Sequence, residues 1–425
     1  MMMNLRWLLE LKWSISLYIK IIVFVDFFAV AIVVPLIQTY FKEADIDTKL
    51  YAFISSAYMI SQFGGTLMGG HIIDKLDKRS ILILSFISSA ISYLLIIIGY
   101  KFKSGYIMLG SRIIVGLFKN TYTISTTILS QIEKNESEKV VSLGHLSAIM
   151  TAAFIIGPLL GGFLFKYMKI LPCIISSILF LINIIITLIL IPKGICANLT
   201  KDNKEVIETS SFRTRMSSLW SKFLSISRLP NVGSLLTIRL LLSLFESSCS
   251  SRSIISYMEK RYAIESHTLG YISSLSSIIS ITSDGFLLPS IILLSSRISN
   301  ATIIPLLIAI SALFNIIEFF NSSIYLYICI TIIPQTLIQS VLSSKIKALQ
   351  LQAISSEHFG KFLSILSLLG TGIGVISPLY GALIFSYFDG IVYRPMISAG
   401  HLLLLSFICI WLPFRDEKKL KEKDL

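Results

Sequence analysis

Charged residues are scarce in this sequence, and their scarcity excludes most soluble classes. Only 14% of the 425 residues are charged, where a soluble globular protein carries about 25%. The five cysteines are scattered singly, with no CxxC pair, which argues against a disulfide framework and against a zinc site. No nucleophile–base pair, phosphate-binding loop or metal-ligand spacing stands out. We therefore expect neither an enzyme nor a cofactor or metal.

Long apolar runs are what the sequence has instead. It is 54% hydrophobic, with a mean hydropathy of +0.79. Uncharged runs that exceed the roughly 17–20 residues needed to cross a bilayer lie at 80–100, 170–192, 298–317, 362–388 and 395–414. Further spans, which hold a few charges or a histidine, lie at 17–41, 50–73, 104–131, 140–165, 232–258, 266–294 and 321–344. The sequence predicts an all-α membrane protein with twelve transmembrane helices.

The positive charge follows the predicted loops. A net charge of +13 could indicate a nucleic-acid partner, but no soluble basic face is available to receive one. With the N-terminus inside, cytoplasmic segments hold far more Lys and Arg than external loops, and 193–228 alone holds seven. We predict cytoplasmic termini, the lipid bilayer as surroundings and no nucleic-acid partner. The choice between the plasma membrane and an internal membrane stays open.

One half of the sequence repeats in the other. A displacement of 220 residues places Asp26 on Glu246, Gly65 on Gly285 and Pro158 on Pro378. Two parallel six-helix repeats are typical of transporters with a binding site near the middle of the membrane. The predicted organisation is a six-helix half at 1–192, a cytoplasmic linker at 193–230, and a second half with a charged tail at 231–425.

The stretch GGHIIDKLDKR interrupts two apolar runs on the predicted cytoplasmic side. Gly70 permits close helix approach, and Asp74 would lie near a helix N-terminus and accept its free N–H groups. Lys78 and Arg79 would pair with acidic loop residues, so the stretch would latch the inner face shut. An ordinary basic cytoplasmic loop is the alternative.

The order of these residues resembles the signature loop of the major facilitator superfamily. The matching positions are Gly70, Asp74, Lys75, Lys78 and Arg79, while Asp77 stands where the family usually has glycine. The resemblance implies a two-half transporter fold, a small-molecule substrate and a monomer.

Two further stretches extend this resemblance. Arg112 with Gly116 resembles the family's Arg-x-x-x-Gly element, and the run from Gly157-Pro158 to Gly161-Gly162 resembles the helix 5 element of antiporters. Together with Asp26, they are similar to the drug:proton antiporter branch. The stretch GLFKNT around Lys119 resembles an animal orphan group, the ninth numbered "major facilitator superfamily domain-containing" proteins.

Charges inside predicted spans are candidate functional groups, because they are expensive in lipid. Arg112, Gly116 and Lys119 are spaced i, i+4, i+7, which predicts one face of a single helix. Lys119 would receive an anionic substrate or pair with Asp26. Asp26 would load and release a proton. Both charges could instead form a fixed structural ion pair.

The second half offers weaker candidates. Glu246 and Arg252 lie six residues apart in one predicted span, on different faces. Pro378 and Gly381 repeat the helix-packing pattern of the first half, for which close packing and a kink are sufficient explanations.

The resulting hypothesis is a secondary active transporter of small organic solutes, coupled to protons by antiport and working by alternating access. An uncoupled facilitator, a lipid-moving protein and a non-transporting receptor on the same fold are the alternatives. The sequence leaves the substrate, the coupling ion and the direction of transport open.

Overall fold

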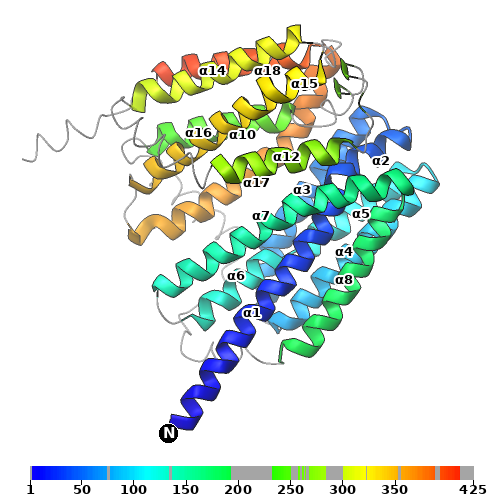
Figure 1. Cartoon of the computed structure of the whole chain (residues 1–425), viewed down its shortest axis with the longest axis vertical. Coiled ribbons are helices and arrows are strands. Elements are labelled where there is room, and N and C mark those ends of the chain that lie inside the picture. The colour runs from blue at the N-terminus through cyan, green and yellow to red at the C-terminus, as the bar shows by residue number, and fades with distance from the viewer. Residues whose placement is uncertain are drawn as a thin grey trace, which may run out of the picture. The chain divides into compact units, whose positions relative to one another are not determined.

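The chain is helical in a computed structural model (Figure 1). The structure describes residues 2–73, 77–133, 136–192, 232–249, 257–258, 261–262, 264, 268–283, 300–321, 323–352, 356–387 and 393–411. The predicted linker at 193–230 and the charged tail after 411 lie outside these residues.

The earlier helices are α1 (Met2–Val33), a 3₁₀ turn η1 (Val34–Leu36), α2 (Ile37–Glu43), α3 (Thr48–Ile73), α4 (Lys78–Lys101), α5 (Gly105–Phe118), α6 (Thr121–Ile132), α7 (Glu136–Tyr167) and α8 (Leu171–Leu190). The later ones are α10 (Val232–Cys249), α12 (Thr268–Thr282), α14 (Asn300–Phe320), α15 (Ile324–Leu326), a π-helical segment η3 (Tyr327–Ile332), α16 (Ile333–Gln352), α17 (Ser356–Tyr387) and α18 (Arg394–Trp411).

These helices form two compact units. The first contains Met1–Ile207 and Glu265–Ser277, and the second contains Glu208–Ile264 and Ile278–Leu425. In the first unit, α1 packs against α7 and α8, while α4 packs against α5 and α8. In the second unit, α14 packs along α18, and α10 packs against α17.

Seven helices in the described part of the chain are long and apolar enough to cross a membrane. Helix α8 illustrates their two-sided character, because Phe180 and Cys173 are buried while Leu181, Ile185 and Ile189 are exposed. Large exposed aliphatic side chains on one helix face suit contact with lipid tails. The chain is thus an all-α membrane protein. The count of twelve spans and the two-repeat layout remain predictions.

Glycines allow α7 to lie very close to α1. A methyl group built on Gly161 would lie 2.1 Å from the Ile32 carbonyl oxygen, and one on Gly157 would lie 2.4 Å from the Ala31 Cβ. Only a residue without a side chain fits at this distance, as is common where membrane helices pack closely. Pro158 and Gly162, the other members of this element, are both buried in α7.

The second unit has a similar approach between α10 and α17. A methyl group on Gly381 would lie 2.6 Å from the Ser248 carbonyl oxygen. Pro378 lies inside α17, one turn earlier.

Candidate functional site

The predicted span at 104–131 is interrupted near its middle. Helix α5 ends at Phe118 and α6 begins at Thr121. Between them, Lys119 has φ −76° and ψ 91°, and Asn120 has φ −124° and ψ 16°, so neither continues the helix. Non-helical backbone at membrane depth is tolerated where its free polar groups find partners within the protein.

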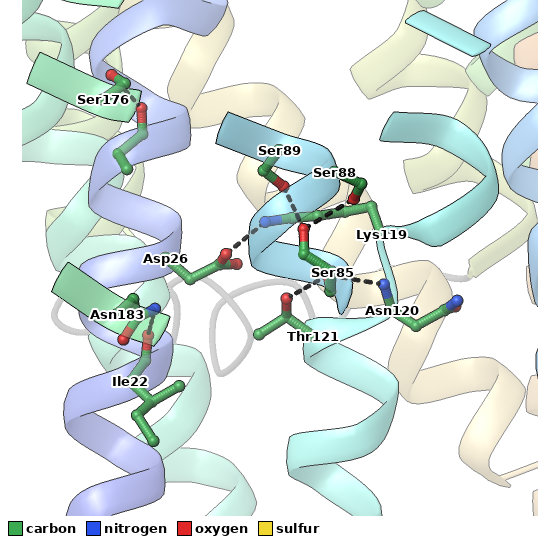
Figure 2. Close-up of polar contacts among 11 residues, drawn as sticks. Ile22, Asp26, Ser85, Ser88, Ser89, Lys119, Asn120, Thr121, Ser176 and Asn183 are labelled. Atoms are coloured by element: carbon green, nitrogen blue, oxygen red, sulfur yellow. Dashed lines mark hydrogen bonds and ion pairs between the residues drawn. The ribbon is translucent and has the colours of Figure 1, made fainter. Parts of the chain in front are cut away.

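Ser85 on α4 supplies partners for this break (Figure 2). Its Oγ accepts a hydrogen bond from the Asn120 N–H at 3.3 Å and lies 3.0 Å from the Thr121 Oγ1. The hydroxyls of Ser88 and Ser89 both donate to the Ser85 carbonyl, at 2.9 and 2.8 Å. The buried polar face of α4 therefore anchors the start of α6.

The break brings Lys119 to Asp26, with which it forms an ion pair (Figure 2). The Asp26 side chain is 0% exposed, whereas that of Lys119 is 14% exposed. The second carboxylate oxygen, Oδ2, accepts no hydrogen bond from the described residues. The Lys119 Nζ also lies 4.9 Å from the centroid of the Phe180 ring. A buried pair of this kind is sensitive to the loss of either partner, because the remaining charge is left without compensation.

Helix α8 holds α1 in place on both sides of this carboxylate. The Asn183 amide donates to the Ile22 carbonyl at 2.9 Å, and the Ser176 hydroxyl donates to the Ala29 carbonyl at 2.8 Å. These carbonyls lie four residues before and three residues after Asp26, so one helical turn on each side is fixed.

Arg112, Gly116 and Lys119 do not share one target, contrary to the expectation of a single face. Arg112 donates to the Ser92 Oγ at 3.3 Å and lies 5.9 Å from the centroid of the Tyr93 ring. Gly116 packs against the backbone of α3. The chain leaves helical geometry at Lys119, so helical spacing no longer fixes the direction of that side chain. The rings that Arg112 and Lys119 contact, Tyr93 and Phe180, are stacked with centroids 5.6 Å apart.

The basic stretch after α3 is described only in part. Arg79 donates through Nη2 to the Leu188 carbonyl at 2.7 Å, and it thereby binds a free carbonyl at the end of α8. Lys78 is a buried residue at the start of α4. Gly70 belongs to α3, and Asp74 and Lys75 lie outside the described residues. The latch stays a prediction.

The second unit contains a buried ion pair that the sequence did not predict. The Arg394 Nη1 lies 3.3 Å from the Glu318 Oε1, and this contact joins the start of α18 to the end of α14. Both residues stand at the ends of predicted spans, where charges are common, so the only signal in the sequence was that their charges are opposite. Glu246 is half-buried on α10, and Arg252 lies outside the described residues.

Residues 20–258 match the family described as Major Facilitator Superfamily. This match covers more than half of the chain, so the chain belongs to that superfamily of membrane transporters.

Among curated proteins, the chain is similar to the quinolone resistance protein NorA of Staphylococcus aureus. The two are 28% identical over 174 residues, which is 40% of this chain and 43% of NorA. It is also 22% identical over 173 residues to multidrug resistance protein 2 of Bacillus subtilis, covering 41% of this chain and 42% of that protein. The match thus spans less than half of either relative.

Solved structures resemble nearly the whole chain. The nucleoside transporter NupG gives a TM-score of 0.69 at 15% identity, with 93% of this chain and 98% of that chain covered. The human organic anion transporter MFSD10 gives 0.63 at 15% identity, with 94% and 99% covered. At such identities the likeness shows the fold alone. The resemblance to the animal orphan group is not confirmed.

Proposed function

We propose that this chain is a secondary active transporter of small organic solutes that works by alternating access and couples transport to protons at the Asp26–Lys119 pair. Membership of the superfamily supports transport. The ion pair carries the rest of the proposal, because it joins a fully buried carboxylate to an ammonium at a break in a membrane helix. The proposal includes twelve spans in two six-helix halves, with both termini cytoplasmic.

The pair is suited to coupling because its two charges depend on each other. A lone charge in a low-dielectric interior is unfavourable, so Asp26 is either paired with Lys119 or neutralised by a proton. A solute that draws Lys119 away from Asp26 therefore changes the proton occupancy of the carboxylate. This links solute binding to proton binding without any further group.

Antiport is the mode that the resemblance implies, and the curated relatives are named for resistance to quinolones and to multiple drugs. Such names favour export of drug-like solutes. Whether the ion pair moves the solute and the proton in the same or in opposite directions depends on which of its two charges the solute contacts.

An uncoupled facilitator, a lipid-moving protein and a non-transporting receptor remain the alternatives. None of these functions requires a buried carboxylate–ammonium pair.

The test is uptake of a mixed panel of small organic solutes into proteoliposomes of the purified full chain, with and without a pH gradient. We expect at least one solute to accumulate only when the gradient is imposed. Asp26→Asn should equilibrate that solute but not concentrate it. Glu43→Gln is the matched control, because Glu43 is another lysine-paired carboxylate of the first unit, with Lys169 Nζ at 2.8 Å. Equilibration of the solute without accumulation, whether or not the gradient is imposed, would identify a facilitator, and binding without uptake would identify a receptor.

A further inference from the structure

The two charges of the pair are unequally accessible. The side chain of Asp26 is 0% exposed and that of Lys119 is 14% exposed. Asp26 lies on α1 between the two points that α8 holds, and its side chain has no exposed surface. An incoming solute would therefore meet the ammonium of Lys119 first. Because an ammonium attracts negative charge, this accessibility favours an anionic solute.

Charge balance then dictates what happens to Asp26. In the resting pair, the carboxylate and the ammonium sum to zero. If an anionic group binds Lys119 in place of Asp26, the carboxylate is left alone in a site with no exposure, which is strongly unfavourable. One proton on Asp26 restores neutrality, since the neutral acid, the ammonium and a monoanion again sum to zero. The anion and the proton would bind together.

A cationic solute fits the same geometry poorly. It would have to reach the fully buried carboxylate of Asp26 and displace Lys119. Lys119 would then have to lose its proton, or remain as a second buried cation near the Phe180 ring. Nothing in the described contacts of Asp26 opens a route for such a group.

The break between α5 and α6 allows the Lys119 side chain to exchange partners. Lys119 continues neither α5 nor α6, although its N–H still closes the last turn of α5 by donating to the Val115 carbonyl at 2.9 Å. Only its side chain has to turn for the ammonium to exchange partners. The start of α6 is held separately, through Asn120 and Thr121, by Ser85. The free N–H groups at that helix start also favour negative charge nearby.

We infer that Lys119 is the contact for an anionic solute, and that one proton on Asp26 accompanies each monoanion. This inference rests on the proposed function and specifies its solute class. Transport would be electroneutral, with the proton and the anion moving in the same direction, which replaces the antiport expected from the resemblance.

Other titratable or charged groups on the surrounding elements do not duplicate Asp26. The carboxylates of α7, Glu136 and Glu138, lie in its first turn. The other such groups include Tyr58 on α3, Tyr93 on α4, Arg112 on α5, Tyr122 on α6, His145 and Lys166 on α7, and Cys173 on α8. None of these is a carboxylate, and Arg112 already contacts Ser92 and Tyr93.

Thermal unfolding of the purified full chain tests the inference with two probe sets of similar size. The anions are benzenesulfonate, phenylacetate and butanesulfonate, each singly charged over the pH range of the test, and the cations are benzyltrimethylammonium, phenethylamine and butylamine. We expect stabilisation by at least one anion and by no cation. If one proton binds with the anion, affinity should fall by up to about tenfold for each pH unit between the titration midpoint of Asp26 in the free chain and its midpoint in the anion complex.

Asp26→Asn gives the sharpest result, because the neutral amide imitates the protonated acid. This variant should bind the anion at pH 7.5 at least as tightly as the unaltered chain does at pH 5.5, and its affinity should not change with pH. Lys119→Gln should not bind the anion. The neutral double variant Asp26→Asn/Lys119→Gln leaves no lone charge, and it should fold and fail to bind. Glu43→Gln should keep the original pH dependence.

Stabilisation by a cation, stabilisation by no anion, or anion binding that ignores pH in the unaltered chain would each overturn the inference. Different results would refute the proposed function and this inference. A cation that accumulates with the pH gradient would refute the anion assignment and leave coupled transport intact. An anion that binds with a proton but never crosses the vesicle membrane would refute transport.

Discussion

The pairing of Asp26 with Lys119 makes a quantitative prediction for stability. Removing one member of a buried ion pair costs about 3–5 kcal/mol, because the other charge stays buried and unpaired. Asp26 has no exposure and Lys119 has little, so both single variants should lie in this range. Replacing both members should cost no more than either single variant, which corresponds to a coupling energy of at least about 3–5 kcal/mol in a double-mutant cycle.

The assay is the free energy of unfolding of Asp26→Asn, Lys119→Met and the double variant at several pH values. Acidic buffer should rescue Lys119→Met, because a proton neutralises the remaining carboxylate. Acid should not rescue Asp26→Asn, whose remaining charge is an ammonium. Additive free energies, or an equal response of both single variants to acid, would refute the reasoning and assign each charge to a separate partner.

Other features predict further outcomes. Gly161→Ala should destabilise the chain by about 1–3 kcal/mol through overlap with the α1 backbone, whereas Gly144→Ala in the same helix meets nothing within 4 Å and should be neutral in thermal unfolding. Glu318→Gln should cost more stability than the paired change of Glu318 and Arg394 to neutral residues, and a smaller loss in the single variant would count against their contact. Asp74→Asn should raise labelling of a reporter cysteine on the cytoplasmic side of α5–α6, and unchanged labelling would reduce the loop to a topology signal. Tags at the two termini should both be protected from external labels, and labelling from opposite sides would contradict the assigned topology.

The sequence predicted uninterrupted helices well, because residues unsuited to lipid mark their ends. The runs at 80–100 and 170–192 correspond to α4 (Lys78–Lys101) and α8 (Leu171–Leu190) within a few residues. The pairing of Asp26 with Lys119 was also foreseeable, since each charge is expensive alone in lipid. The roles of these residues in transport remain proposals.

The break at Lys119 could not be predicted from local sequence. No proline or glycine marks positions 119 and 120, and the preceding spacing is helical. The break depends on Ser85, which lies on another helix and satisfies the interrupted backbone. A pattern that does hint at this contact is the spacing of Ser85, Ser88, Ser89 and Ser92, which places four hydroxyls on one face of α4. The periodicity of one segment does not reveal the hydrogen-bond partners that other helices supply.

The two hydrogen bonds from α8 to α1 fix the positions of these helices relative to each other within the first unit. Ser176 and Asn183 are seven residues apart, so both project from one face of α8 and grip α1 two turns apart. Helices bound at two such points cannot easily rotate or slide against each other. Probe pairs on α1 and α8 should therefore keep a constant separation during a transport cycle, so distances measured from them to α6 would report the motion of α6 itself.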